Sequence, residues 1–175
     1  MPERTTHSKQ LFSEIDVTPD YIAPIIVGYD IKTPENMGNI IRLADNFGSK
    51  LLLFVTNLEH TRNSRIKKTA SSSFSSVNWS FCKEEELKSI LPQDYKWIAI
   101  ETSSDSENIY NVDFPKKIVL FVGNEINGIN SMLLDKCYKI VHIPVHGNNT
   151  SMNVSHALAI ALSEVQKNHL YGNPA

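Results

Sequence analysis

Four short, almost continuous apolar runs constrain the fold of this chain more than any other feature. They are four or five residues long and do not alternate between apolar and polar positions: 25–29, 51–55, 97–100 and 118–122. Such runs are typical of strands covered on both faces, as in a parallel sheet. Segments 77–81 and 140–143 are weaker strand candidates.

Helical patterns separate these runs. Thr33 and Pro34 suit the N-cap and first position of a helix that ends before Gly48. We expect two further helices, one over 83–91 and one that begins at Ser151 or Asn153 and runs to about residue 168. The alternation predicts an α/β fold with a mainly parallel sheet and helices on both of its faces.

Composition excludes several classes of protein. The 175 residues carry a net charge of -2, so nucleic acid would have to bind a local patch. Cys82 and Cys137 lack the spacing of a zinc site or a disulfide framework, and we expect no metal and a cytoplasmic location. Residues 1–20 lack the apolar run of a signal peptide, and no run is long enough to cross a membrane. We expect an extension over 1–20 and one domain over 21–175.

The first segment that indicates chemistry lies inside the first helix. Gly38 and Arg42 are four residues apart, so they share one helical face, away from the apolar stripe. A glycine inside a helix costs about 1 kcal/mol relative to alanine, and the close approach of a ligand beside Arg42 is one reason to retain it. The alternative is a solvated Arg42 that pairs with Asp45 or Asn46.

The second segment follows the strongest strand and reads Gly123-Asn124-Glu125-Ile126-Asn127-Gly128. Ligands of open α/β sheets bind outside the carboxyl ends of the strands, where glycines allow close approach of the backbone. Gly-Asn and Asn-Gly are also ordinary turn pairs, so a simple turn is the alternative.

The third segment is a strand that ends at Ile143-Pro144, a polar loop, and then Ser151-Met152-Asn153-Val154-Ser155. The N-terminus of a helix binds polar ligand groups. Ser151 and Asn153 could equally do no more than cap the last helix.

A basic segment without an acidic residue is the fourth candidate. It contains Arg62, Arg65, Lys67 and Lys68, and we expect a loop that either holds RNA phosphates or is simply solvated.

The three segments, in this order, resemble the motifs of the SpoU-type (TrmH-like) ribose methyltransferases of the SPOUT superfamily. Asn36, Gly38 and Arg42 match the first motif, and Gly123 and Glu125 match the second. Ser151-Met152-Asn153-Val154-Ser155 matches the third, with methionine in place of the family's leucine. The resemblance covers residues 22–168.

The resemblance implies an S-adenosylmethionine-dependent enzyme that methylates a ribose 2′-hydroxyl of RNA. It also implies a deep C-terminal trefoil knot and a homodimer, in which the small residues Ala157, Ala159 and Ala161 would suit close helix packing. The expected catalytic residues are Asn36, Arg42, Glu125, Ser151 and Asn153. Arg42 would hold phosphate and stabilise the developing alkoxide, while Glu125 would orient Arg42 or the ribose. The expected cofactor-binding residues are Thr102, Gly123, Asn124, Ile143 and Met152.

The RNA substrate is open at this point. We favour tRNA over rRNA, because the chain shows no separate N-terminal RNA-binding domain and a small dimer suits a compact folded substrate. Two other functions compete: an RNA-binding or cofactor-binding relative without activity, and an unrelated α/β nucleotide-binding enzyme.

Overall fold

The computed structural model describes residues 21–56, 63–148 and 151–172. The extension expected over 1–20 lies outside the described residues. No helix in the described part of the chain has the length and apolar character needed to span a bilayer.

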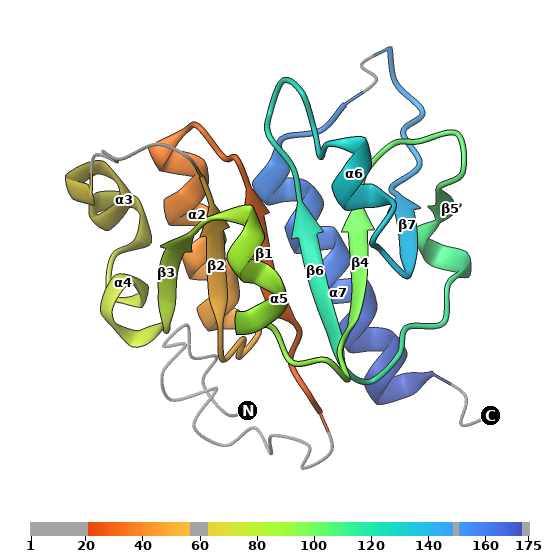
Figure 1. Cartoon of the computed structure of the whole chain (residues 1–175), viewed down its shortest axis with the longest axis horizontal. Coiled ribbons are helices and arrows are strands. Elements are labelled where there is room, and N and C mark those ends of the chain that lie inside the picture. Colours follow the sequence, from red (N-terminus) through yellow and green to blue (C-terminus); the bar gives the residue numbers. More distant parts are fainter. Residues whose placement is uncertain (1–20, 57–62, 149–150, 173–175) are drawn as a thin grey trace, which may run out of the picture.

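Seven parallel strands form the sheet (Figure 1), so the parallel arrangement predicted from the apolar runs is confirmed. In chain order the strands are β1 Ile25–Tyr29, β2 Leu52–Val55, β3 Trp79–Cys82, β4 Lys96–Ile100, β5 Glu107–Asn108, β6 Ile118–Val122 and β7 Lys139–His142. The two-residue strand β5 has no apolar run and was not predicted. The order across the sheet is β3-β2-β1-β6-β4-β7-β5, so β6 lies between β1 and β4, and β7 lies between β4 and β5.

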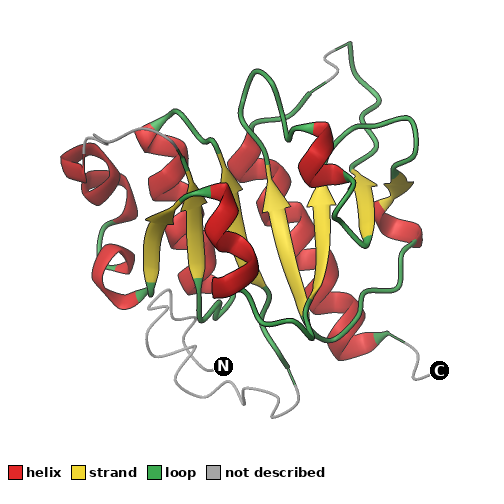
Figure 2. Cartoon of the chain, viewed as in Figure 1, coloured by secondary structure: helices red, strands yellow, loops and turns green. Residues whose placement is uncertain are grey.

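Helices cover both faces of the sheet (Figure 2). In chain order they are α2 Pro34–Asn46, α3 Asn63–Ala70, α4 Ser73–Ser76, the 3-10 turn η1 Glu84–Glu86, α5 Leu87–Ile90, the 3-10 turn η2 Ile109–Asn111, α6 Ser131–Leu134 and α7 Val154–Tyr171. The single helix expected over 83–91 is instead the turn η1 followed by one turn of α5.

Two apolar clusters hold these layers together. Buried side chains of α2, α3 and α7 pack against one face of the sheet, which includes Phe54 and Leu120. Leu87 of α5 and Leu133 of α6 pack against the other face, beside Phe121. Ala161 belongs to the first cluster and is 1% exposed, so it is a core residue and is not free to form the dimer contact expected of it.

Candidate active site

A cavity of about 370 Å³ lies where the carboxyl ends of β4, β6 and β7 meet. Its walls come from these strand ends, from the loop after β6, from the segment after β7 and from the first residues of α7. All five residues expected to bind a cofactor line it: Thr102, Gly123, Asn124, Ile143 and Met152. The strand ends and the last motif therefore line one cavity, and their role in cofactor binding stays a prediction.

The titratable side chains of the lining are two carboxylates, Glu101 and Glu125, and one imidazole, His142. Among the residues that the structure describes, no lysine or arginine lines the cavity. Apolar side chains such as Val122 and Ile143 form much of the remaining wall. A cavity with this lining favours a neutral or positively charged ligand over a polyphosphate.

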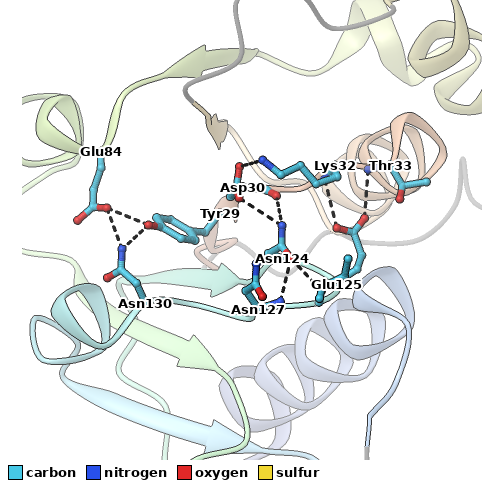
Figure 3. Close-up of polar contacts among 10 residues, drawn as sticks. Tyr29, Asp30, Lys32, Thr33, Glu84, Asn124, Glu125, Asn127 and Asn130 are labelled. Atoms are coloured by element: carbon cyan, nitrogen blue, oxygen red, sulfur yellow. Dashed lines mark hydrogen bonds and ion pairs between the residues drawn. The ribbon is translucent and has the colours of Figure 1, made fainter.

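Asn124 closes the loop after β6 on itself. Its Oδ1 accepts hydrogen bonds from the backbone N–H groups of Ile126 at 2.8 Å and of Asn127 at 2.9 Å. Its Nδ2 donates to the carbonyl oxygen of Asp30 at 2.8 Å, which anchors the loop to the end of β1 (Figure 3). The backbone of Asn124 also pairs with that of Gly128 in an antiparallel bridge. The loop is therefore held by hydrogen bonds among its own residues and to the end of β1.

The two glycines of this loop are required by its own packing. A Cβ on Gly123 would lie 2.6 Å from the carbonyl carbon of Gly128. Gly128 has a φ of 64°, and a Cβ there would overlap the carboxylate of Glu101. We expected Gly123 to be small so that a cofactor could approach the backbone. The structure gives a different reason, because the loop itself fills the space that a side chain would need.

A chain of hydrogen bonds joins the three sequence motifs. Glu125 accepts from Asn36 Nδ2 at 2.8 Å and from the backbone N–H groups of Lys32 and Thr33 at 3.2 Å each. Asn36 Oδ1 in turn accepts from Asn153 Nδ2 at 3.0 Å. The Oδ1 of Asn153 accepts from the backbone N–H of Ser155 and so caps α7. Three segments far apart in the sequence therefore meet at one edge of the sheet.

Glu125 stabilises the start of α2 from outside the helix. The Thr33 side chain makes no capping bond there, contrary to the sequence interpretation, and the carboxylate lies at the positive end of the helix dipole instead. Burial alone would raise the pKa of Glu125, but the hydrogen bonds from Asn36 and the backbone outweigh it and lower the pKa. Glu125 is therefore held ionised. It contacts Asn36 and makes no direct contact with Arg42, so the expected direct orientation of Arg42 is not seen within the chain, and the alternative role toward the ribose stays a prediction.

Arg42 and Ser151 stand apart from this chain of hydrogen bonds. Ser151 lines the cavity but makes no hydrogen bond to another described residue. Of the two residues expected to cap the last helix, Asn153 is the N-cap of α7. Arg42 is exposed and has no hydrogen bond or ion pair within the described ranges. It is six residues after Asn36 on α2, so the two side chains project roughly 120° apart around the helix axis. Arg42 does not line the cavity of its own chain.

Both interpretations of the Gly38 face require correction. A Cβ on Gly38 would lie 2.5 Å from the Cβ of Thr69, so the glycine allows α2 and α3 to pack closely and does not admit a ligand. Asp45 accepts hydrogen bonds from Ser73 at 2.6 Å and Ser76 at 3.2 Å, so it does not pair with Arg42.

The basic segment is a helix and not the loop expected. Arg65, Lys67 and Lys68 lie on α3, and all three are exposed. Arg62 lies outside the described residues. Because α3 packs on α2, the helix that carries Arg42, both contribute positive charge near one another.

The sequence interpretation missed several residues that shape the site. Glu101 lines the cavity and accepts the backbone N–H of Ile129 at 3.0 Å. Asn130 caps α6 and donates to Glu84 at 3.2 Å, while Tyr29 donates to the same carboxylate at 3.0 Å (Figure 3). Burial and the neighbouring Glu84 raise the pKa of Tyr29 to about 12, so it remains a hydrogen-bond donor. A polar residue directly after a buried strand, such as Glu101, was the available signal.

Comparison with known proteins identifies the family. The model of the SpoU rRNA Methylase family matches residues 23–163. The chain belongs to this family. The resemblance drawn from the motifs is thereby confirmed, as are the expected RNA 2′-O-methyltransferase class and the S-adenosylmethionine cofactor at the level of the family.

Individual relatives differ in the RNA that their names specify. The tRNA (guanosine(18)-2'-O)-methyltransferase of Aquifex aeolicus is 27% identical over 160 residues, which are 86% of this chain and 74% of the relative. The 23S rRNA (guanosine-2'-O-)-methyltransferase RlmB of Blochmanniella floridana is 29% identical over 160 residues, 89% of this chain and 62% of the relative.

A solved structure has the same fold. The AdoMet-bound rRNA methyltransferase from Sinorhizobium meliloti superposes with a TM-score of 0.77 at 23% identity, over 89% of this chain and 59% of that one. The chain thus spans less than two thirds of that protein.

Proposed function

We propose that this protein transfers a methyl group from S-adenosylmethionine to a ribose 2′-hydroxyl of tRNA. The observation that carries the proposal is the chain of hydrogen bonds Glu125–Asn36–Asn153, which brings the family's three motifs together beside one cavity. The relative named for tRNA, matched over 74% of its length, supports tRNA over rRNA.

The cavity fits the cofactor in size and chemistry. About 370 Å³ lies in the usual range for a small-molecule site, and apolar walls such as Ile143 and Met152 suit an adenosine ring. Glu101 and Glu125 provide negative charge for a positive ligand, and the described part of the lining holds no lysine or arginine that would compete. S-adenosylmethionine supplies a methyl group already activated by its sulfonium charge. The protein's own task is to orient the ribose and to stabilise its oxygen as the hydroxyl loses a proton.

Arg42 is the residue we assign to that task. A guanidinium stays protonated, so Arg42 acts by holding RNA phosphate and stabilising the developing alkoxide, while the proton passes to phosphate or water. Ser151 shapes the cavity wall, whereas Asn36, Glu125 and Asn153 fix the start of α2 and α7. These three are positioning residues in our proposal.

We also propose a homodimer with a knotted C-terminal region. Arg42 does not line the cavity of its own chain, so a second copy would bring Arg42 to a complete site. The late strands β6 and β7 lie between earlier strands, an order that supports threading of the C-terminal part of the chain. Light scattering that shows only monomers with full activity would contradict the dimer.

The test pairs cofactor binding with product analysis. Calorimetry should show that S-adenosylmethionine binds the purified protein in the absence of RNA. Mass spectrometry of nucleosides should show that one 2′-O-methylated nucleotide is missing from the tRNA of cells lacking the protein. Adding the purified protein and S-adenosylmethionine to that tRNA in vitro should restore the modification. A modification found only in rRNA would reject the tRNA assignment, and no modification with intact cofactor binding would favour an inactive relative.

A further inference from the structure

A second hollow lies on the face of the sheet opposite α7. It has a volume of about 530 Å³, and its lining includes three lysines and three aromatic residues: Lys88, Lys96, Lys136, Tyr95, Trp97 and Tyr138. Figure 1 shows that, between α5 and α6, none of the described helices lies in front of the amino-terminal halves of β6 and β4. We refer to this site as the lysine–aromatic hollow.

In the hollow, aromatic rings cover the face of the sheet. The ring of Trp97 lies over the buried Phe121 with their centroids 5.0 Å apart. Tyr138 is 54% exposed, so part of its side chain is accessible to a ligand. Exposed rings on a sheet surface are the feature on which nucleic-acid bases stack.

The charge of the hollow is positive. Lys88 and Lys96 form no ion pair with any residue that the structure describes, and Lys96 Nζ lies 5.5 Å from the ring centre of Tyr138. Lys136 pairs with Glu84 at 3.1 Å, so its charge is partly neutralised. No acidic residue of the described ranges lines the hollow. Two free ammonium groups beside an open ring suit phosphates joined to bases.

We propose that the lysine–aromatic hollow binds a segment of the substrate RNA outside the reaction site. The inference rests on the proposed function for its ligand class. Trp97 and Glu101, which lines the cofactor cavity, are four residues apart in or next to β4, about 13 Å along a strand, so one RNA molecule can reach both sites. A second protein copy is the weaker alternative, because lysines are depleted in the cores of protein interfaces.

Two variants separate charge from stacking. The double variant Lys88→Ala/Lys96→Ala should weaken binding of bulk tRNA from cells lacking the protein about tenfold at low salt. It should also reduce the slope of log affinity against log salt by about 1 to 2, since two phosphate contacts are lost. Tyr138→Ala should weaken tRNA binding by about tenfold with an unchanged salt slope, and Tyr138→Phe should restore it because the ring is retained.

A matched control removes the same charge elsewhere. Lys50→Ala/Lys167→Ala also deletes two exposed lysines, of which Lys167 pairs with Glu164 at 2.9 Å, and should change the salt slope little. Affinity for S-adenosylmethionine, measured by calorimetry, should be the same in every variant, which also shows that each is folded. At saturating tRNA the turnover should be normal, because the hollow contributes to binding and not to the reaction.

The outcomes distinguish this inference from the proposed function. If the unaltered protein methylates tRNA and the hollow variants bind tRNA normally, the inference is overturned while the function stands. If the unaltered protein binds cofactor but no tRNA, the proposed substrate fails first. If the double variant changes the oligomeric state in light scattering, the hollow is an interface between copies and the inference is equally overturned.

Discussion

Replacing Glu125 with alanine tests whether the hydrogen bonds that join the three motifs stabilise the fold. The carboxylate accepts one hydrogen bond from Asn36 and two from the backbone at the start of α2. Asn36 is only 7% exposed, so its amide would lose a partner in a place that water reaches poorly. The start of α2 would also lose the negative charge that faces its dipole.

The expected loss can be estimated from these contacts. A hydrogen bond to a charged group contributes about 1.5–3 kcal/mol, but the exposure of Glu125 reduces this through solvent screening. Loss of the dipole interaction adds about 0.3–1 kcal/mol. We expect Glu125→Ala to lower the free energy of unfolding by about 2 kcal/mol. For a chain of this length that corresponds to roughly 4–8 °C in Tm.

A double-mutant cycle isolates the pair. Chemical denaturation of Glu125→Ala, Asn36→Ala and the double variant should give a coupling energy of about 1 kcal/mol, because the residues share one bond. Glu35→Ala is the matched control: it removes an acid from the first turn of the same helix, where Glu35 is exposed and has no partner among the described residues. It should cost about 0.5 kcal/mol and show no coupling to Asn36.

The same pair gives a pH dependence with a definite sign. Because the folded state lowers the pKa of Glu125 below its ordinary value of 4.5, the unfolded state binds more protons between the two values. The stabilisation is therefore complete above about pH 4.5 and is lost as pH falls through the folded pKa. The stability difference between the unaltered protein and Glu125→Gln should shrink in acid. This account of Glu125 would be refuted by two results together: additive effects of the two single variants on the free energy of unfolding, and a stability difference between the unaltered protein and Glu125→Gln that does not change with pH.

Three further predictions follow from the site. Arg42→Ala should reduce methyl transfer by roughly a hundredfold and leave cofactor affinity intact, and Arg42→Lys should remain impaired; normal turnover in the alanine variant would end its catalytic role. Gly123→Val should lower Tm and abolish cofactor binding together, since the loop backbone occupies the side-chain space; a stable variant that binds cofactor would contradict the packing. Alanine at Arg65, Lys67 and Lys68 should flatten the salt dependence of tRNA binding without altering cofactor affinity; an unaltered slope would make α3 an ordinary solvated helix.

The strands could be predicted because the local sequence of each buried strand is almost entirely apolar. Runs such as 118–122 are apolar at every position, which only strands covered on both faces tolerate, and the structure places β6 in the middle of the sheet. Strand β5 has the sequence Glu-Asn and pairs only with β7. It forms because of where the chain passes, so no local pattern could reveal it.

Pairings across the chain account for the errors at the site. Gly38 is small because Thr69 lies against it, and Asp45 is satisfied by Ser73 and Ser76 from α4. These partners are about 30 residues away in the sequence. Helical spacing relates only neighbours on the same helix, so it indicated either a ligand beside Gly38 or, as the alternative, an arginine paired with Asp45.

The geometry also separates two kinds of residue that the motifs list together. Asn36, Glu125 and Asn153 satisfy one another's hydrogen bonds, so their side chains are largely occupied by holding α2, the loop after β6 and α7 in register. Arg42 is exposed and lies on the same helix as Asn36. Whatever fixes the start of α2 therefore also fixes the direction in which Arg42 projects. Loss of Glu125 should act on catalysis through the placement of Arg42, and loss of Arg42 should leave the placement of α2 unchanged.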